Sequence, residues 1–331
     1  MKKIVYTLIL LLSLVLSGCA SNNTTAENED GKSIIYTTVY PLQFFAQEIG
    51  GDYVETKSIY PPGTDEHTFE PSQKDMISLA DADLFVYIGL GLEGFVEKAK
   101  ETLKNEDVTL ISAGENVSIQ SQEHEEEDHG DHTDHEEHDH EHEHEGHDHE
   151  EHDGHNHGDI DPHVWLNPQY AKELADSIKN ALIEKMPEHK AVFEENYETL
   201  SRELDTLDQE FMTAIEAAPK KEILVSHAAY GYWEERYGIE QISVSGLSTS
   251  NEPSQKQLQN IIEEAKEHQL EYIFFEQNVS SKLTEIIRTE IGAEALTLHN
   301  LAVLTDQDIQ NESDYFTLMK ENLKNLEKAL Q

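Results

Sequence analysis

The sequence is poor in several residue types, and each shortage excludes a class of protein. Its 331 residues include a single cysteine, so no disulfide can form within the chain. Lys and Arg number 23 against 68 Asp and Glu, which gives a formal net charge of −45 at pH 7. Phosphate groups would repel such a chain, so nucleic acid is excluded as its main partner. Hydrophobic residues make up 37%, enough for a real core and too many for a disordered chain.

Long apolar runs are also rare, and the one near the amino terminus predicts a processing signal. The uncharged stretch 4–16 is shorter than the ~20 residues of a membrane-spanning helix. We expect residues 1–18 to be a signal peptide. Its last residues and the one that follows read Leu16-Ser-Gly-Cys19, which resembles a bacterial lipobox and implies a lipid on Cys19. The alternative is an ordinary signal followed by a free cysteine. The polar segment 19–32 predicts a flexible tether, so we expect a lipid-anchored protein on the extracytoplasmic face of a bacterial cytoplasmic membrane, at the cell surface if the cell is Gram-positive.

Acidic residues are concentrated between Glu123 and Asp159, where 18 carboxylates and 13 histidines occur without any Lys or Arg. Without these carboxylates the net charge would be −27, which is ordinary for a soluble extracytoplasmic protein. The stretch lacks apolar periodicity and aromatic residues, so we expect 121–160 to be a mobile loop. It is interpreted as a low-affinity zinc collector or sensor, with a solvated acidic spacer as the alternative. Its predicted weak metal ligands are His129, His132, His135, His138, His140, His142, His144, His147, His149, His152, His155 and His157.

Strand patterns alternate with helical patterns in two regions, which is typical of α/β layers around a mainly parallel sheet. In the first lobe, 33–187, we expect strands at 33–38, 54–60, 84–88 and 108–112 and helices at 41–49, 72–80 and 94–104. In the second lobe, 219–331, we expect strands at 222–226, 239–244, 271–275 and 294–298 and helices at 254–268, 280–291 and 312–330. The predicted fold is therefore α/β, with two similar lobes whose sheets are flanked by helices.

Between the lobes, the segment 188–218 predicts one long connecting helix. Apolar residues recur there at three- and four-residue steps, which indicates an amphipathic helix. Pro187 and Pro219 bracket it, and proline is tolerated at helix ends rather than in helix interiors. At ~1.5 Å per residue such a helix would extend ~45 Å, long enough to cross both lobes as a rigid strut. A helical hairpin is the less favoured alternative, because the segment has no break.

Three histidines outside the acidic loop follow strands or precede helices. His227 directly follows a predicted strand, His67 lies in the loop after the second strand, and His163 follows the acidic loop. Strand exits of α/β sheets line the crevice where ligands bind, and Glu276 also occupies such an exit. Three imidazoles and a carboxylate form a donor set that suits Zn²⁺. The remaining histidines are interpreted as surface or hydrogen-bonded core residues, and they are His189, His268 and His299.

Five motifs carry a resemblance to a known family. They are Thr38-Val-Tyr-Pro-Leu42, Pro62-Gly-Thr-Asp-Glu-His67, Asp161-Pro-His-Val-Trp-Leu-Asn-Pro168, His227-Ala-Ala-Tyr-Gly-Tyr-Trp233 and Phe275-Glu-Gln-Asn-Val-Ser280. With them, nearly all of the chain after the tether resembles the cluster A-I solute-binding lipoproteins of ABC transporters for zinc and manganese, and within these the zinc-specific branch. A His/acid loop at this position is also typical of the zinc members.

The resemblance implies a zinc receptor that is not an enzyme and that serves an ABC permease and its ATPase, with the receptor itself a monomer. It implies that His67, His163 and His227 are zinc ligands and that Glu276 occupies the fourth ligand position. Glu66 is a weaker candidate, because in some members a water or the acid beside the first histidine takes part instead. Since zinc must displace protons from imidazoles of ordinary pKa ~6.5, we expect capture to weaken below pH ~6.

Several alternatives stay open at this point. They are a manganese or iron receptor of the same fold, a surface adhesin with structural zinc, and a hydrolytic zinc enzyme that would need an open coordination position. Two motif matches are interpreted as chance. His140-Glu-His-Glu-His144 fits the zinc-protease pattern but lies in a repeat of His and acid. Gly89-Leu-Gly-Leu-Glu-Gly94 fits a dinucleotide fingerprint but follows the third strand, without an acidic partner for a ribose.

Overall fold

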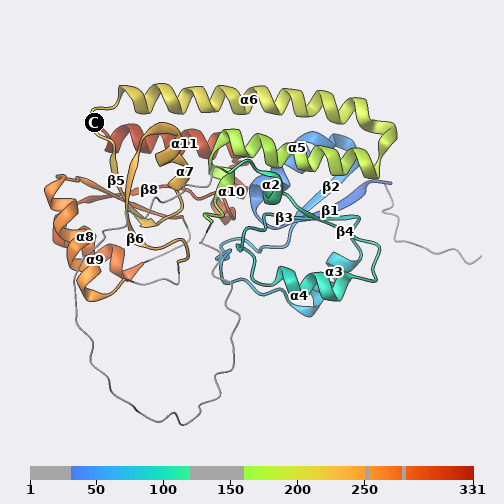
Figure 1. Cartoon of the computed structure of the whole chain (residues 1–331), viewed down its shortest axis with the longest axis horizontal. Helices are drawn as coiled ribbons and strands as arrows, with labels where there is room; N and C mark the ends of the chain where they lie inside the picture. The colour runs from blue at the N-terminus through green and yellow to red at the C-terminus, as the bar shows by residue number, and fades with distance from the viewer. Residues whose placement is uncertain (1–30, 120–159, 250–252, 278–280) are drawn as a thin grey trace, which may run out of the picture.

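The computed structural model describes residues 31–119, 160–249, 253–277 and 281–331, which form two four-stranded sheets of the same topology (Figure 1). The first sheet has the order β2-β1-β3-β4, with β1 (Ser33–Thr37), β2 (Val54–Ser58), β3 (Leu84–Tyr87) and β4 (Thr109–Ser112). The second has the order β6-β5-β7-β8, with β5 (Glu222–His227), β6 (Glu240–Ser245), β7 (Tyr272–Phe275) and β8 (Glu294–Thr297). All neighbouring strands pair in parallel, and every strand expected from the sequence is present.

Each sheet is covered by helices on both faces, which explains why a central strand such as β3 is buried at every residue (Figure 1). In the first lobe, α2 (Tyr40–Gly50) lies on one face, and α3 (Gln73–Ala80) and α4 (Val96–Leu103) lie on the other. In the second lobe, α7 (Gly231–Tyr237) and α11 (Tyr315–Ala329) lie opposite α8 (Gln255–Glu267) and α9 (Lys282–Ile291). Short helices η1 (Gly51–Tyr53), η2 (Gly114–Asn116), η3 (Val164–Leu166), η4 (Pro187–His189) and α10 (Asp306–Gln310) lie in the connections.

The helix α6 (Lys190–Ala217) crosses from one lobe to the other as the predicted strut (Figure 1). It packs against α2 and α5 in the first lobe and against α7 and α11 in the second. Its buried stripe is the one expected from the sequence and includes Phe193, Leu200 and Phe211. Asp208, also buried, accepts hydrogen bonds from Arg236 (2.6 and 2.9 Å) and from the Tyr237 hydroxyl (3.0 Å), which fasten the strut to α7.

The helix α5 (Pro168–Lys185) was not anticipated from the sequence. It packs beside α6, so the two consecutive helices form a hairpin, although 190–217 by itself is one unbroken helix. Its start was readable, because the Asn167 side chain accepts from the Gln169 amide and proline stands at the first helical position. The short helices α7 and α10 were also missed.

A hydrophobic core built around buried aromatic residues extends through both lobes, and a second, smaller core lies within the second lobe. The Trp165 indole donates to the Asn300 carbonyl at 2.7 Å, and the Trp233 indole donates to the Leu166 carbonyl at 2.7 Å. The Tyr315 hydroxyl donates to the Trp165 carbonyl at 2.8 Å. These buried bonds join segments of both lobes, so the structure favours small movement between them.

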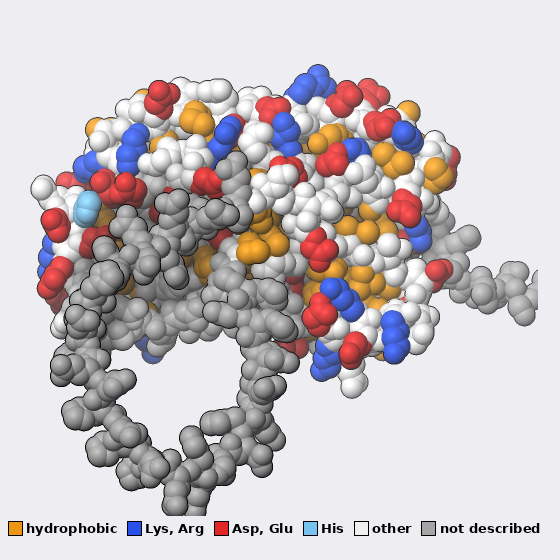
Figure 2. Space-filling view, in the orientation of Figure 1, with side chains coloured by type: hydrophobic (Ala, Val, Ile, Leu, Met, Phe, Trp, Pro, Cys, Tyr) orange, Lys and Arg blue, Asp and Glu red, His pale blue; other side chains and the backbone are white. Residues whose placement is uncertain are grey.

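Acidic and basic side chains are interspersed over the face of α5, α6 and the first lobe (Figure 2). Within the described ranges, no helix has the length and apolarity that crossing a membrane requires. The expected signal segment 1–18, Cys19 and the histidines of the acidic loop lie outside the described residues.

Candidate metal centre

The structure brings His67, His163 and His227 together between the two lobes. One ring nitrogen from each lies within 4.8 Å of the others, and they are the only such group of three or more potential ligands among the described residues. Their ring centroids are 4.8–5.3 Å apart. Their side chains are 8%, 0% and 2% exposed, respectively. Buried imidazoles in this arrangement are a nitrogen donor set ready for a cation.

Three different elements position these rings. His67 lies on the loop that follows β2, His163 immediately precedes η3, and His227 is the last residue of β5. In the second sheet the strand order reverses between β5 and β7, and such a switch point leaves a crevice at the carboxyl ends of the strands. Glu276 directly follows β7 and so lies at the same point.

Asp161 orients the His163 ring. Its Oδ1 lies 2.7 Å from His163 Nδ1 and also accepts from the His163 backbone amide at 2.9 Å. Because a carboxylate only accepts, Nδ1 carries the proton and Nε2 presents a lone pair towards His67 Nε2, 3.3 Å away. The glycine at 231 leaves room for this carboxylate, since a Cβ there would lie 2.8 Å from Asp161 Oδ2 and would have to displace it.

His227 forms an ion pair with Glu276. Its Nδ1 lies 2.5 Å from Glu276 Oε1, and its Nε2 lies 3.1 Å from the Leu247 carbonyl oxygen. Burial by itself lowers the pKa of His227, but the charge and hydrogen bond of Glu276 outweigh it and raise the pKa to about 9. At neutral pH His227 is therefore an imidazolium, and it must lose a proton to bind a metal.

The opposite shift occurs at His67. Burial, together with the neighbouring His163 and His227, lowers the pKa of His67 to about 3. The ring is thus neutral over the physiological range and needs no deprotonation to act as a ligand.

Asn300 joins the two acidic candidates. Its Nδ2 donates to Glu66 Oε1 at 2.9 Å and to Glu276 Oε2 at 3.1 Å. Both carboxylates are buried, at 6% exposure each. Burial and the charge of Glu276 raise the pKa of Glu66 to about 8, so Glu66 holds its proton at pH 7 unless a cation enters.

The sequence-predicted residues therefore meet, with one distinction. The three histidines form a cluster that could hold a metal ion, whereas Glu276 contacts it through His227 and Glu66 lies 4.0 Å from His67 Nε2. Sequence reasoning missed Asn300 and the orienting role of Asp161. A polar residue just beyond β8, and an acid two residues before a histidine, were the available signals.

The other histidines described lie away from this cluster. His299 is buried, with Nδ1 accepting from the Leu301 amide at 2.9 Å, and His189 stacks on Tyr53 at 3.7 Å. His268 lies 3.4 Å from Glu222 on the surface. All three match their interpretation as surface or hydrogen-bonded core residues.

The glycine-rich segment 89–94 closes around a carboxylate of its own. Glu93 accepts from the amides of Ile88 (2.8 Å) and Gly89 (2.9 Å) and from the Thr38 hydroxyl (2.8 Å). These amide donors would face a phosphate in a dinucleotide site. Here the buried Glu93 side chain takes that place.

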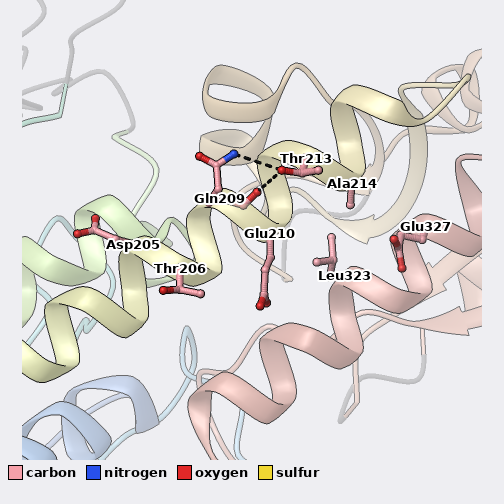
Figure 3. Close-up of a pocket in the computed structure, with 8 residues that line it drawn as sticks. All are labelled: Asp205, Thr206, Gln209, Glu210, Thr213, Ala214, Leu323 and Glu327. Carbon is pink, nitrogen blue, oxygen red and sulfur yellow. Dashed lines mark hydrogen bonds between the residues drawn. The ribbon is translucent and has the colours of Figure 1, made fainter.

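A separate groove lies between α6 and α11 (Figure 3). Gln209 donates to Thr213 at its rim, and Glu210 pairs with Lys320 at 3.5 Å. None of its residues belongs to the histidine cluster, which is the one group of potential metal ligands found among the described residues. The groove is lined by Asp205, Thr206, Gln209, Glu210, Thr213, Ala214, Leu323 and Glu327.

Comparison with known proteins agrees with this geometry. The chain is 34% identical over 330 residues to the zinc-binding lipoprotein AdcA of Streptococcus pneumoniae, covering 99% of this chain but only 61% of that protein. It is 32% identical to the high-affinity zinc uptake system protein ZnuA of Bacillus subtilis, covering 96% of this chain and 94% of that protein. The Zn(II)-bound ZnuA-like domain of Streptococcus pneumoniae AdcA superposes with a TM-score of 0.70 at 30% identity, covering 91% of this chain and 99% of that domain. Residues 35–329 match the family of the periplasmic zinc-uptake complex component A, and the chain belongs to that family.

Proposed function

We propose that this chain is an extracytoplasmic receptor that captures Zn²⁺ with high affinity and delivers it to an ABC importer. The convergence of three buried imidazoles from separate elements carries the proposal. The named relatives support it, since AdcA and ZnuA are described as zinc-binding and zinc-uptake proteins. Zinc is the cargo here, not a resident cofactor.

His67, His163 and His227 would supply the three nitrogen ligands, and Glu276 the fourth ligand. Glu66 is the weaker candidate for that position. A nitrogen-rich set favours Zn²⁺ over Mn²⁺, which prefers oxygen donors. The orienting contact of Asp161 with His163 supports tight binding, because such outer partners fix the ring and raise its basicity.

The site is better suited to transport than to hydrolysis. A catalytic zinc keeps one coordination position open for water, whereas four protein donors are close at hand here. We therefore propose that the protein has no enzymatic activity of its own.

Delivery requires partners and a location that extend the family assignment. We propose a monomer that hands zinc to a permease driven by a cytoplasmic ATPase, anchored by a lipid on Cys19. The organisation would be a signal at 1–18, a tether at 19–32, lobes at 33–187 and 219–331, and a connecting helix at 188–218. The loop 121–160 would collect zinc weakly, and deleting 123–159 should leave one tight site intact. Loss of that site on deletion would contradict the two-site arrangement.

Metal analysis and competition titration of wild type and His227→Asp test the function. With residues 123–159 deleted, the otherwise unchanged protein should bind one zinc tightly. The His227→Asp variant should lose the preference for zinc over manganese, because an oxygen ligand replaces a nitrogen ligand. His268→Asp is the matched control, since that histidine lies on the surface away from the cluster. Tighter binding of manganese than zinc by the wild type would favour the manganese receptor instead. Weak binding of every divalent metal would refute the receptor.

A further inference from the structure

Asn300 connects the segments that carry the site. Its amide bonds to Glu66 from the first lobe and to Glu276 from the second, and its backbone carbonyl accepts from the Trp165 indole. Asn300 is 3% exposed, so none of these bonds competes with bulk water. One side chain therefore holds both carboxylates of the centre in place.

The orientation of this amide is determined by its other contacts. Asn300 Oδ1 accepts from Gln277 Nε2 at 2.9 Å and from the Ala302 backbone amide at 3.0 Å. With two donors on the oxygen, the NH₂ group must face the carboxylates. Rotation of the amide by 180° would place its oxygen against both acids and leave the donors of Gln277 and Ala302 without an acceptor.

This geometry limits how many oxygens a cation can take. Nearly linear bonds from one NH₂ group place the two accepting oxygens about 5 Å apart. Two oxygens bound to one zinc at 2.0–2.2 Å cannot be that far apart, so the pair held by Asn300 cannot both be ligands. At most one of these two oxygens can therefore bind the cation, so Glu66 and Glu276 cannot both bind it in bidentate fashion.

We propose that Asn300 is a positioning residue that sets metal selectivity by keeping at least one of the two oxygens that it holds, Glu66 Oε1 and Glu276 Oε2, away from the cation. The inference rests on the proposed zinc-receptor function and deepens it. A low oxygen count keeps the coordination number near four, which suits zinc, and disfavours Mn²⁺, which prefers more oxygen ligands.

Asn300→Asp is the sharpest test, because it keeps the shape and the acceptor facing Gln277 and Ala302 but can no longer donate to both acids at once. Zinc affinity should fall by roughly 10- to 100-fold, as is typical for an outer-shell partner. Manganese affinity should hold or rise, so that the zinc-to-manganese affinity ratio falls by at least about tenfold. In the Co²⁺-loaded protein, the visible d–d bands should weaken as coordination rises above four. Asn300→Ala, which adds no new charge, should change the ratio and the bands in the same direction.

Asn322→Ala is the matched control. Asn322 is 1% exposed and holds the same loop through the backbone of His299, but it touches neither carboxylate. It should lower stability while leaving the affinity ratio and the Co²⁺ spectrum unchanged. Equal changes in the control, or wild-type selectivity in both Asn300 variants, would overturn the inference. Absence of zinc binding in the wild type would instead refute the proposed function.

Discussion

Zinc binding at pH 7 should release almost two protons, one from His227 and one from Glu66. Their pKa values of about 9 and about 8 make these groups roughly 99% and 90% protonated at pH 7 before the cation arrives. A bound cation needs His227 unprotonated and favours ionised Glu66, so the expected release is about 1.9 protons. His67 adds nothing, because with a pKa of about 3 it is already neutral.

This number differs clearly from that of an unperturbed site. A histidine with an ordinary pKa of 6.5 would release only about 0.24 proton at pH 7, and an ordinary glutamate almost none. The release should also decline at higher pH, to about 1.0 proton at pH 8.5. Capture should therefore begin to weaken below pH ~9, well above the value of ~6 expected from unperturbed imidazoles.

Calorimetric titration in several buffers of different ionisation enthalpy measures this release directly. Glu276→Gln should reduce the count by about one proton or more, because the carboxylate that raises the pKa of both His227 and Glu66 is gone. The surface variant His268→Asp should leave the count unchanged. A wild-type release below about 0.5 proton at pH 7, or an affinity that stays flat between pH 6 and 8.5, would refute the reasoning.

Three further predictions concern closure, the strut and stability. Thr249→Val removes the 2.7 Å hydrogen bond from the Thr249 hydroxyl to Asp65, which lies beside His67. Because one such bond contributes about 1 kcal/mol, zinc release measured by stopped-flow chelation should accelerate roughly fivefold. An unchanged rate would contradict a role for that bond in retaining zinc. Asp208→Ala leaves Arg236 and Tyr237 without their shared acceptor. Urea titrations should show a free energy of unfolding lower by about 2 kcal/mol, while zinc affinity is retained. Altered zinc affinity would contradict a purely structural role for Asp208. The free energy of unfolding of the metal-free protein should fall by on the order of 1–2 kcal/mol per pH unit between pH 7 and 9. The reason is that the folded pKa values of His227 and Glu66 are raised above their unfolded values, so the folded protein loses these protons in that range. Thermal unfolding should show this loss, and stability that rises with pH would contradict it.

The secondary structure was largely readable because local patterns express it. Inner strands such as β3 and β7 are short apolar runs, and the stripe of α6 has a clear helical period. The helix α5 begins at Pro168, the last residue of the Asp161–Pro168 motif, and no helix was expected there. It packs against α6, and the packing of two helices against each other depends on the tertiary structure rather than on local sequence patterns.

The residues of the candidate site were partly readable for a similar reason. His227 and Glu276 stand at strand exits, and parallel strands bring such exits to one edge of a sheet. His67 and His163 come from loops whose path no local pattern specifies, so their prediction rests on their placement near strand and helix ends and on motif resemblance. The role of Asn300 was out of reach, since it bonds Glu66 across 234 positions of sequence.

The sequence by itself determined the two-lobe α/β plan, the acidic character and the metal chemistry, because composition, periodicity and donor type are local properties. Only the tertiary structure decided how the donors behave. It pairs His227 with Glu276, leaves His67 neutral and joins Glu66 to Glu276 through one amide. These outcomes depend on burial and on distances between distant segments, and such quantities exist only after the chain has folded.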